Sequence, residues 1–390
     1  MKRRAILLLL LIVVAGCAGD ETLRFGAVLP LTGDFDIYGQ SVKNGVELAF
    51  DELRANPAFP YAIDLMVADT GSDPTRAGEL AEQQYDAGAL AIIGGVTTAE
   101  ALQMVSVADK NDRLLISPSA SSPELTGISK NFYRIFPSDF VEGTKMGNFA
   151  AQGLKAETAV ILAKEEAYAK GVQEVFQAEF ERHGGEVLEV VEFPEGISDF
   201  SGLVARVITL NPSAVYLAAY AHEIGSMVES LRAQRFEGRI LTTHAFASPE
   251  VMAERAAQGV FLTQPFFDTS SDEPSIQRFV AAYEERFGKR PDLYAAHGYD
   301  SVMVLAKGLE EPLRTPSDFW RRMRAIQAYP GVTGTIQFNE KGDVGKFPRV
   351  YVVDKGNLRD YETEVAAERQ RLLEKLRKLR DEQSQAGTDG

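Results

Sequence analysis

The chain has 390 residues, of which 45% are hydrophobic, and its formal net charge at pH 7 is -15. This many apolar residues can fill substantial cores, and the length predicts about two domains. Because phosphate binding needs a basic surface, the excess of acidic residues argues against a nucleic acid partner.

The N-terminal segment has the pattern of an export signal. Three basic residues, Lys2 to Arg4, precede an apolar run from Ala5 to Ala15 that ends in small residues. This run is shorter than the roughly 20 residues that span a bilayer. The sequence VAGC at 14–17 resembles the bacterial lipobox, which implies that residues 1–16 are a lipoprotein signal peptide and that lipid on Cys17 anchors the exported protein to the membrane. Cys17 is the only cysteine, so no internal disulfide is expected.

Apolar, β-rich runs then alternate with amphipathic helical stretches. Strands are predicted at Leu23–Pro30, Ile63–Ala68, Ala91–Gly94, Leu114–Ser117, Thr158–Ala163, Glu186–Phe193, Ala214–Ala219, Arg239–Thr243 and Gly259–Thr263. Helices are predicted between them at Gly39–Asn56, Pro74–Ala87, Ala99–Asn111, Ala169–His183, Phe200–Leu210 and His222–Gln234. This alternation predicts an α/β fold with βα units on parallel sheets.

Two segments have neither period, Asn131–Asp139 and Phe261–Thr269, and we expect them to cross between domains. Three further helices are predicted, at Ile276–Phe287, Tyr294–Leu309 and Pro316–Ile326. A β pair, Gly334–Phe338 with Arg349–Val353, is expected to follow.

The last segment, residues 361–390, reads as a charged helix with a weak apolar stripe and a disordered end at 384–390. A full coiled-coil seam is absent. The helix is expected either to lie on its own domain or to pair with a partner.

Two hydroxyl-rich turns follow neighbouring predicted strands, AIIGGVTTAEALQ at 91–103 and SPSASSPEL at 117–125. Both fit a capping box, Thr97 with Glu100 and Ser121 with Glu124, so each is expected to begin a helix. Such turns suit a nucleophile site, a phosphate cradle or a clamp for a small anionic ligand.

The first two chemistries lack their motifs. There is no GxSxG, no GxxxxGK[ST] and no GxGxxG, and the four histidines show no spacing that selects a general base. No HExxH and no tight His or carboxylate cluster points to a metal. The sequence therefore predicts no catalytic residue, no metal site, no cofactor and no enzyme activity.

The clamp remains. Unpaired N–H groups at helix N-termini, flanked by Thr98, Ser119 and Ser121, suit a carboxylate without any basic side chain. The alternative, that these hydroxyls merely cap helices, stays open.

A set of ordered motifs resembles the branched-chain amino acid (leucine/isoleucine/valine) binding family of type I periplasmic solute-binding proteins. The motifs are Pro30 to Gly33, Tyr38-Gly39, Asp69, Asp73-Pro74, Ile92 to Gly94, Thr97-Thr98, Ser117 to Leu125, Asp199-Phe200, Tyr220, Pro291 and Phe338 to Asp343. The resemblance implies two Rossmann-like lobes that close on a small molecule like a flytrap and deliver it to an ABC permease. Lobe 1 would be 23–136 and 266–338, and lobe 2 would be 137–265 and 339–360. A ligand sensor that is not coupled to transport is the alternative.

The resemblance also implies the ligand-binding residues. The carboxylate would bind Thr98 and Ser121, and the turn Ser119-Ala120 would face the ligand amine with the Ser119 carbonyl. The remaining positions would line the pocket from both lobes: Tyr38, Tyr168, Tyr220, His244 and Tyr294.

One position departs from the family. Its amino acid binders carry an acidic residue after the strand that corresponds to 239–243, whereas here the turn reads Thr243-His244-Ala245-Phe246. A buried ammonium without a counter-charge is costly. Either Glu223 or another acid substitutes, or the ligand is not a zwitterion.

Overall fold

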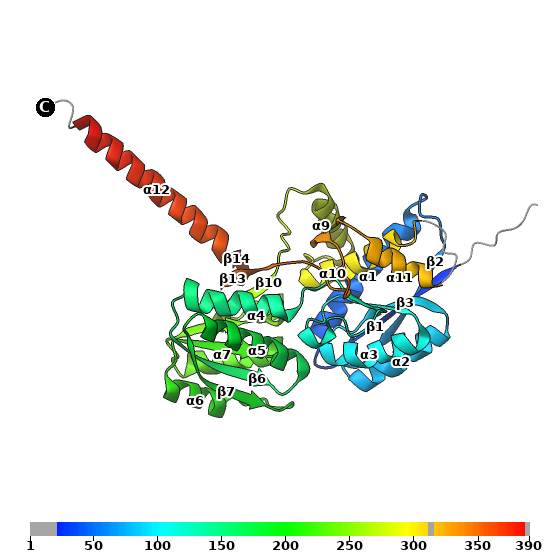
Figure 1. Cartoon of the computed structure of the whole chain (residues 1–390), viewed down its shortest axis with the longest axis horizontal. Coiled ribbons are helices and arrows are strands. Elements are labelled where there is room, and N and C mark those ends of the chain that lie inside the picture. Colours follow the sequence, from blue (N-terminus) through cyan, green and yellow to red (C-terminus); the bar gives the residue numbers. More distant parts are fainter. Residues whose placement is uncertain (1–21, 311–315, 387–390) are drawn as a thin grey trace, which may run out of the picture.

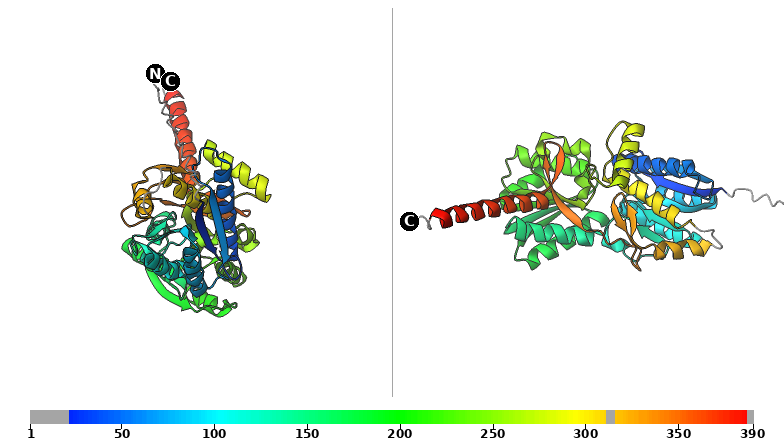
Figure 2. Two further views of the ribbon diagram at one scale, coloured as in Figure 1. Left: turned by 90° about the vertical axis from the view of Figure 1, so that its right-hand side faces the viewer. Right: turned by 90° about the horizontal axis from the view of Figure 1, so that it is seen from above.

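Two α/β lobes lie side by side in the computed structural model, which describes residues 22–310 and 316–386 (Figures 1 and 2). The predicted fold class is therefore confirmed. The predicted signal peptide and Cys17 lie outside the described residues. Within the described part of the chain, no helix is both long and apolar enough to cross a bilayer.

Lobe 1 is built on a five-stranded sheet in which every pair of neighbours is parallel. Its order is β2-β1-β3-β4-β5, with β1 Leu23–Leu29, β2 Ile63–Asp69, β3 Ala89–Gly94, β4 Leu114–Ser117 and β5 Phe132–Arg134. Its helices are α1 (Asp36–Ala55), α2 (Pro74–Asp86), α3 (Thr98–Asn111), α9 (Pro274–Phe287), α10 (Leu293–Lys307) and α11 (Pro316–Ala325).

The sheet of lobe 1 is buried on both faces. Successive residues of β1 point to opposite sides, so Val28 packs with the cluster under α2 and α3 while Ala27 and Leu29 pack on the side of α1 and α10. Helices α1 and α10 approach closely at glycine, since a Cβ on Gly45 would lie 1.9 Å from the carbonyl oxygen of Ala295.

Lobe 2 holds a seven-stranded sheet of order β14-β13-β10-β9-β8-β6-β7. Its strands are β6 (Thr158–Lys164), β7 (Glu186–Phe193), β8 (Ala214–Ala218), β9 (Arg239–Thr242), β10 (Phe261–Pro265), β13 (Pro348–Asp354) and β14 (Asn357–Asp360). Five strands are parallel, and β13 and β14 add an antiparallel edge. The helices are α4 (Asp139–Asn148) with a π-helical turn at Phe149–Gly153, α5 (Ala167–Arg182), α6 (Ser201–Leu210), α7 (Ala221–Ala233) and α8 (Pro249–Met252).

The predicted β pair of 334–338 with 349–353 is wrong. β12 (Gly334–Ile336) pairs with β11 (Tyr329–Gly331), whereas β13 pairs with β10 and β14. The alternating pattern of each strand was recognised, but its partner was decided by long-range packing. Three segments connect the lobes. They are 135–138, 266–273 and 337–347, the last of which lies between β12 and β13. Where each lobe begins and ends along these segments stays a prediction.

The expected crossing at 131–139 was only partly right, because it includes β5 and the first residue of α4. The capping box at Ser121 is wrong. Ser122, not Ser121, is the cap, and it begins a 3₁₀ turn of three residues, Pro123–Leu125, in place of an α-helix. The capping box of Thr97 and Glu100 is confirmed.

The C-terminal helix α12 (Tyr361–Ala386) projects away from lobe 2 (Figures 1 and 2). Its first turn is anchored on lobe 2, with the ring of Tyr361 5.3 Å from Phe149 and 5.4 Å from Phe261 between centroids. Its apolar stripe is exposed at Val365, Leu372, Leu373 and Leu376. The expectation that the helix lies on its own domain is therefore wrong. The end predicted to be disordered is helical as far as Ala386, and 387–390 lie outside the described residues.

A buried arginine ties two of the connections together. The Nε atom of Arg134 donates to Asp343 at 2.6 Å, and its other nitrogens donate to the Ser122 carbonyl and the Thr126 hydroxyl. The guanidinium is fully buried. Every polar contact here replaces water, so removal of one partner leaves the others unpaired.

We predict that Arg134→Met lowers the free energy of unfolding by about 3 kcal/mol or more, because it leaves Asp343 buried without its counter-charge. Urea denaturation measures this. The matched control is Arg290→Met, which breaks an exposed ion pair with Glu284 and should cost less than about 1 kcal/mol. Equal losses in the two variants would contradict the structural role of Arg134.

Candidate functional site

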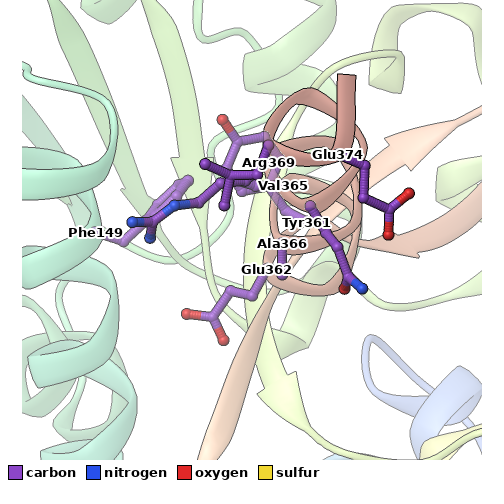
Figure 3. A pocket seen from close by; sticks show the side chains of 9 residues that line it. Phe149, Tyr361, Glu362, Val365, Ala366, Arg369 and Glu374 are labelled. Atoms are coloured by element: carbon purple, nitrogen blue, oxygen red, sulfur yellow. The ribbon is translucent and has the colours of Figure 1, made fainter. Parts of the chain in front are cut away.

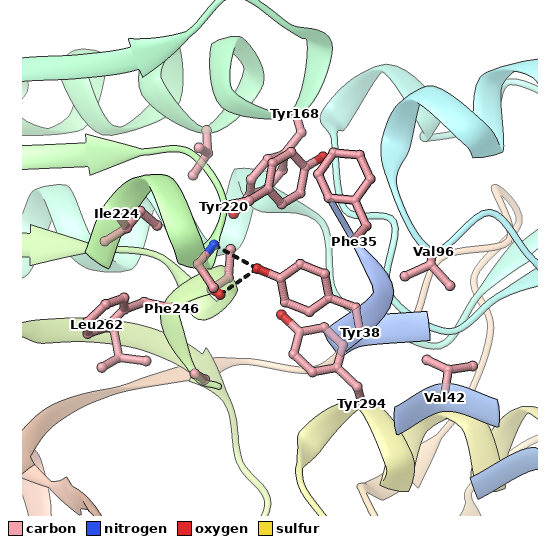
Figure 4. Packing of buried hydrophobic residues seen from close by; sticks show 14 of the residues in the cluster. Phe35, Tyr38, Val42, Val96, Tyr168, Tyr220, Ile224, Phe246, Leu262 and Tyr294 are labelled. Carbon is pink, nitrogen blue, oxygen red and sulfur yellow. Dashed lines mark hydrogen bonds between the residues drawn. The ribbon is translucent and has the colours of Figure 1, made fainter. Parts of the chain in front are cut away.

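A cavity lies between the lobes, beyond the carboxyl ends of the parallel strands of both sheets. This is the edge at which open α/β sheets bind ligands. Figure 4 shows the aromatic side of the cavity, where Tyr38 and Tyr294 of lobe 1 face Tyr168 and Tyr220 of lobe 2. The space between the atoms here is about 290 Å³, part of which is open to solvent. The lining residues are Tyr38, Val96, Thr97, Thr98, Ser119, Ala120, Ser121, Tyr168, Tyr220, His244, Ala245 and Tyr294.

All nine residues predicted to bind the ligand line this single cavity: Tyr38, Thr98, Ser119, Ala120, Ser121, Tyr168, Tyr220, His244 and Tyr294. Their role in binding stays a prediction, since no ligand contact tests it. Cys17, predicted to carry lipid, lies outside the described residues.

The N-terminus of α3 forms the polar wall of lobe 1. Thr97 caps the helix by accepting from the amide of Glu100 at 3.2 Å, and Glu100 accepts in turn from the Thr97 amide. Thr98 is the first helical residue, and its side chain is buried. The first amides of a 14-residue helix therefore face the cavity edge with a partial positive charge.

The second turn is tied to the first by its own hydroxyls. Ser117 donates to the Gly95 carbonyl at 2.8 Å, and Ser119 donates to the Val96 carbonyl at 2.6 Å. The hydroxyl of Thr98 accepts from the Ser122 amide at 3.4 Å. Because the Ser119 hydroxyl is committed to Val96, Ser121 is the serine of this turn whose hydroxyl best suits a ligand.

Tyr38 links the two lobes across the cavity. Its hydroxyl donates to the Ala245 carbonyl at 2.8 Å and accepts from the Ala221 amide at 2.8 Å, as Figure 4 shows. Tyr294 donates to the His244 carbonyl at 3.3 Å. Burial raises the pKa of Tyr38 and Tyr294 well above its ordinary value, so both hydroxyls stay protonated. The lobes are thus closed in this structure.

A buried acidic cluster lies behind His244. Glu142 accepts from the His244 amide at 2.8 Å and from the Thr263 hydroxyl at 2.9 Å, and its second oxygen lies 2.5 Å from Nδ1 of His244. Asp139, one turn earlier on α4, is also buried and donates its amide to the Ser121 carbonyl. These three residues form a cluster with the spacing of a metal site. The expectation of no tight cluster is therefore wrong, because residues about 100 positions apart meet only in the folded chain.

The cluster shifts the pKa of its members. Burial and the charge of Glu142 raise the pKa of Asp139 to about 8. Burial lowers the pKa of His244, but the charge and hydrogen bond of Glu142, with the charge of Asp139, outweigh it and leave that pKa above its ordinary value. Of the described residues, none makes a hydrogen bond of good geometry to either Asp139 oxygen, although the Ser121 side chain is close enough to affect its pKa.

Sequence reasoning also missed a buried lysine. Lys164, at the end of β6, forms an ion pair with Glu223 at 2.8 Å and lies about 5.4 Å from the ring centroid of Tyr220. Glu223 also accepts from the Tyr220 amide. Glu223 is therefore engaged as a helix cap and counter-ion. A lysine inside an apolar strand run was the one available signal.

A larger hollow lies elsewhere, between the first turns of α12 and the π-helical turn of lobe 2 (Figure 3). Phe149, Tyr361, Val365 and Leu373 give it apolar walls. All of its lining residues except Phe149 come from the single helix α12. The cavity between the lobes is thus the better candidate for a specific small-molecule site.

Two sheets whose strand ends face each other across a small, polar and aromatic cavity define a two-lobed solute-binding protein. The comparison with known families agrees: the periplasmic binding protein model matches residues 22–354, and the chain belongs to that family. The family consists of binding proteins, so the expectation that the chain is not an enzyme is confirmed at that level.

Known relatives confirm the resemblance to the leucine/isoleucine/valine branch. The chain is 23% identical over 331 residues to the leucine-, isoleucine-, valine-, threonine- and alanine-binding protein of Pseudomonas aeruginosa, covering 84% of this chain and 88% of the relative. The leucine-binding protein LivK of Thermotoga maritima is 29% identical, with a TM-score of 0.81 over 86% of this chain and 97% of that one. A solute-binding protein from R. palustris in complex with benzoate shares the fold, with a TM-score of 0.80, 19% identity and coverage of 87% and 95%.

Asp139→Asn should stabilise the protein at pH 7 to 8. An aspartate with a raised pKa takes up a proton on folding, so its stability contribution is full below pH 3.8 and falls as pH rises toward about 8. Asparagine removes that loss, and each pKa unit is worth about 1.36 kcal/mol. We expect a gain of at least ~1 kcal/mol at pH 8 and less at pH 5, measured by urea denaturation.

The matched control for this prediction is Asp34→Asn, because Asp34 is exposed. It should leave the pH dependence unchanged. A loss of stability in Asp139→Asn at every pH from 5 to 8 would contradict the assigned shift.

Proposed function

We propose that this protein is an exported, lipid-anchored solute-binding protein of an ABC importer that holds a small carboxylate between its two lobes. One observation carries the proposal: hydroxyl groups and the amides of a helix N-terminus face tyrosines of the opposite lobe across a closed cavity. A carboxylate satisfies several of these donors at once.

The clamp consists of Thr98, Ser121 and the first amides of α3. No lysine or arginine lines the cavity among the described residues. The partial charge of the helix N-terminus and the hydroxyl donors would therefore replace a basic side chain in holding the anion.

The relatives support a ligand that has a carboxylate group more firmly than they support any particular ligand side chain. Two of them are named for binding leucine, whereas a protein of the same fold was solved with benzoate. The feature that leucine and benzoate share is the carboxylate, which is also what the wall of lobe 1 suits.

Ligand binding is proposed to stabilise the closed state. A ligand that contacts Thr98 and Ser121 on lobe 1 and Tyr168 and Tyr220 on lobe 2 has all its partners only when the lobes meet. It therefore shifts the population toward closure. The membrane permease would bind the closed form. Lipid on Cys17 would keep the protein at the membrane.

A ligand sensor that is not coupled to transport is the second candidate. The observation that favours it is α12, whose exposed residues Val365, Leu372, Leu373 and Leu376 offer a surface for a partner.

Deletion of residues 366–390 separates the two functions. The truncation leaves Tyr361 and its ring contacts in place, so ligand binding and thermal stability should not change. We expect ligand uptake in cells to persist within twofold under the transport proposal. The sensor is favoured by a different pair of results. The full-length protein would support no ligand uptake, and the truncated protein would lose signalling.

Thr98→Ala combined with Ser121→Ala should weaken carboxylate binding at least tenfold. Each hydrogen bond to a charged group is worth about 1.5 to 3 kcal/mol. Isothermal titration calorimetry with leucine and 4-methylpentanoate measures the loss.

The matched control is Thr75→Ala combined with Ser106→Ala, which removes two exposed hydroxyls of lobe 1. It should bind like the unchanged protein. Unchanged affinity in the Thr98 and Ser121 double variant, with its fold intact, would remove the clamp from the proposal.

A further inference from the structure

We infer that the ligand is a carboxylate without an α-ammonium group, and that His244, held in place by Glu142, is the residue that selects against amino acids. This inference rests on the proposed function and specifies its substrate class. It follows from the groups on and behind the cavity wall at His244.

The cavity offers no counter-charge to an ammonium group. Of the described residues that line it, none is an aspartate or a glutamate. An ammonium enclosed there would lose its water and gain only tyrosine hydroxyls and backbone carbonyls, two of which, at His244 and Ala245, already accept from Tyr294 and Tyr38. Burial of an uncompensated charge is costly.

Glu142 is the nearest carboxylate behind this wall, and its acceptors are in use. Three donors converge on it: the amide and Nδ1 of His244 and the hydroxyl of Thr263. The imidazole of His244 stands between Glu142 and the cavity. A ligand ammonium can reach this carboxylate only by displacing the histidine.

The charges of the cluster also disfavour an ammonium. Burial lowers the pKa of His244, but the charge and hydrogen bond of Glu142 outweigh it and leave that pKa above its ordinary value, which favours the protonated ring beside Glu142. Asp139, with a pKa of about 8, is mostly neutral. The ring of His244, which lines the cavity, therefore offers an ammonium no negative charge and repels it when the ring is protonated. With Nδ1 committed to Glu142, Nε2 is the ring nitrogen left to donate to a ligand.

The other acids near the cavity are engaged or shielded. Glu223 pairs with Lys164. Glu166 is buried beside Tyr220, where burial raises its pKa to about 7, and the charge of Lys164 counters it. Neither lines the cavity.

The remaining walls suit an apolar or aromatic body. Tyr38, Tyr168, Tyr220 and Tyr294 surround it, with ring centroids 4.8 Å apart for Tyr38 and Tyr294 and 5.2 Å apart for Tyr168 and Tyr220. Such rings contact flat or branched hydrocarbon closely. The substrate class is thus a small aliphatic or aromatic monocarboxylate, with a hydroxyl or keto oxygen accepted at the His244 end.

Matched ligand pairs that differ only in the ammonium group test this inference. Calorimetry on the mature protein at pH 7 compares 4-methylpentanoate with L-leucine and 3-phenylpropanoate with L-phenylalanine. We expect the acid without the ammonium to bind at least tenfold more tightly in one or both pairs. Tighter binding of the amino acids would overturn the inference while leaving the carboxylate proposal intact.

A different set of binding results would reject the proposed function itself. If no member of either pair, nor benzoate, binds, and none raises the melting temperature, then both the carboxylate proposal and this inference fail. Leucine binding that releases about one proton, measured in buffers of different ionisation enthalpy, would place the ammonium on an ionised Asp139 and overturn the role of His244.

A variant tests His244 directly. His244→Glu with Glu142→Gln puts a carboxylate at the cavity wall and removes the one at position 142, and it should move the preference toward the amino acid at least tenfold. The control is His222→Glu, because His222 is exposed on α7. An unchanged preference in a folded double variant would contradict the assignment. If that variant does not fold, the matched pairs on the unchanged protein decide.

Discussion

The hydroxyl of Tyr38 is the contact on which the closed arrangement depends. It leaves lobe 1 and forms one hydrogen bond with each of two backbone groups of lobe 2, the carbonyl of Ala245 and the amide of Ala221. Both groups lie just beyond strand ends, in the same turns that carry His244 and Tyr220. This contact between the lobes therefore also holds two of the turns that line the cavity, so that closure and the shape of the site are coupled.

The site concentrates its charges behind the wall and presents few of them to the ligand. Glu142, Asp139 and Lys164 are all buried, and each acts through a residue that does line the cavity: His244, Ser121 and Tyr220. Inside a low-dielectric interior such networks position side chains firmly when they are satisfied. The unsatisfied carboxyl of Asp139 is the exception, and its raised pKa is the physical consequence.

Local sequence patterns predicted the elements of both lobes well. The strand at Leu114–Ser117 and the capping box at Thr97 have the expected positions, because apolar alternation and a short-range cap are properties of neighbouring residues. The errors concern contacts between residues that are far apart in the chain. The strand at Pro348–Asp354 pairs with β10, about 85 residues earlier in the chain, and Ser121 fits a capping pattern without a helix to cap. The exposed stripe of α12 shows likewise that a periodic row of apolar side chains does not specify which surface, if any, packs against it.

The sequence by itself determined the α/β class and the positions of most strands and helices, because turn chemistry and hydrophobic period act within a few residues. The ordered motifs identified the family, and the resemblance implied which residues line the cavity. Only the tertiary structure decided that Glu142 meets His244 across about 100 residues, that Lys164 occupies Glu223 and that Arg134 meets Asp343. The first two pairs lie within lobe 2, and the third joins β5 to the connecting segment 337–347. Each depends on elements far apart in the chain packing into one place, and no local pattern encodes the distance between such groups.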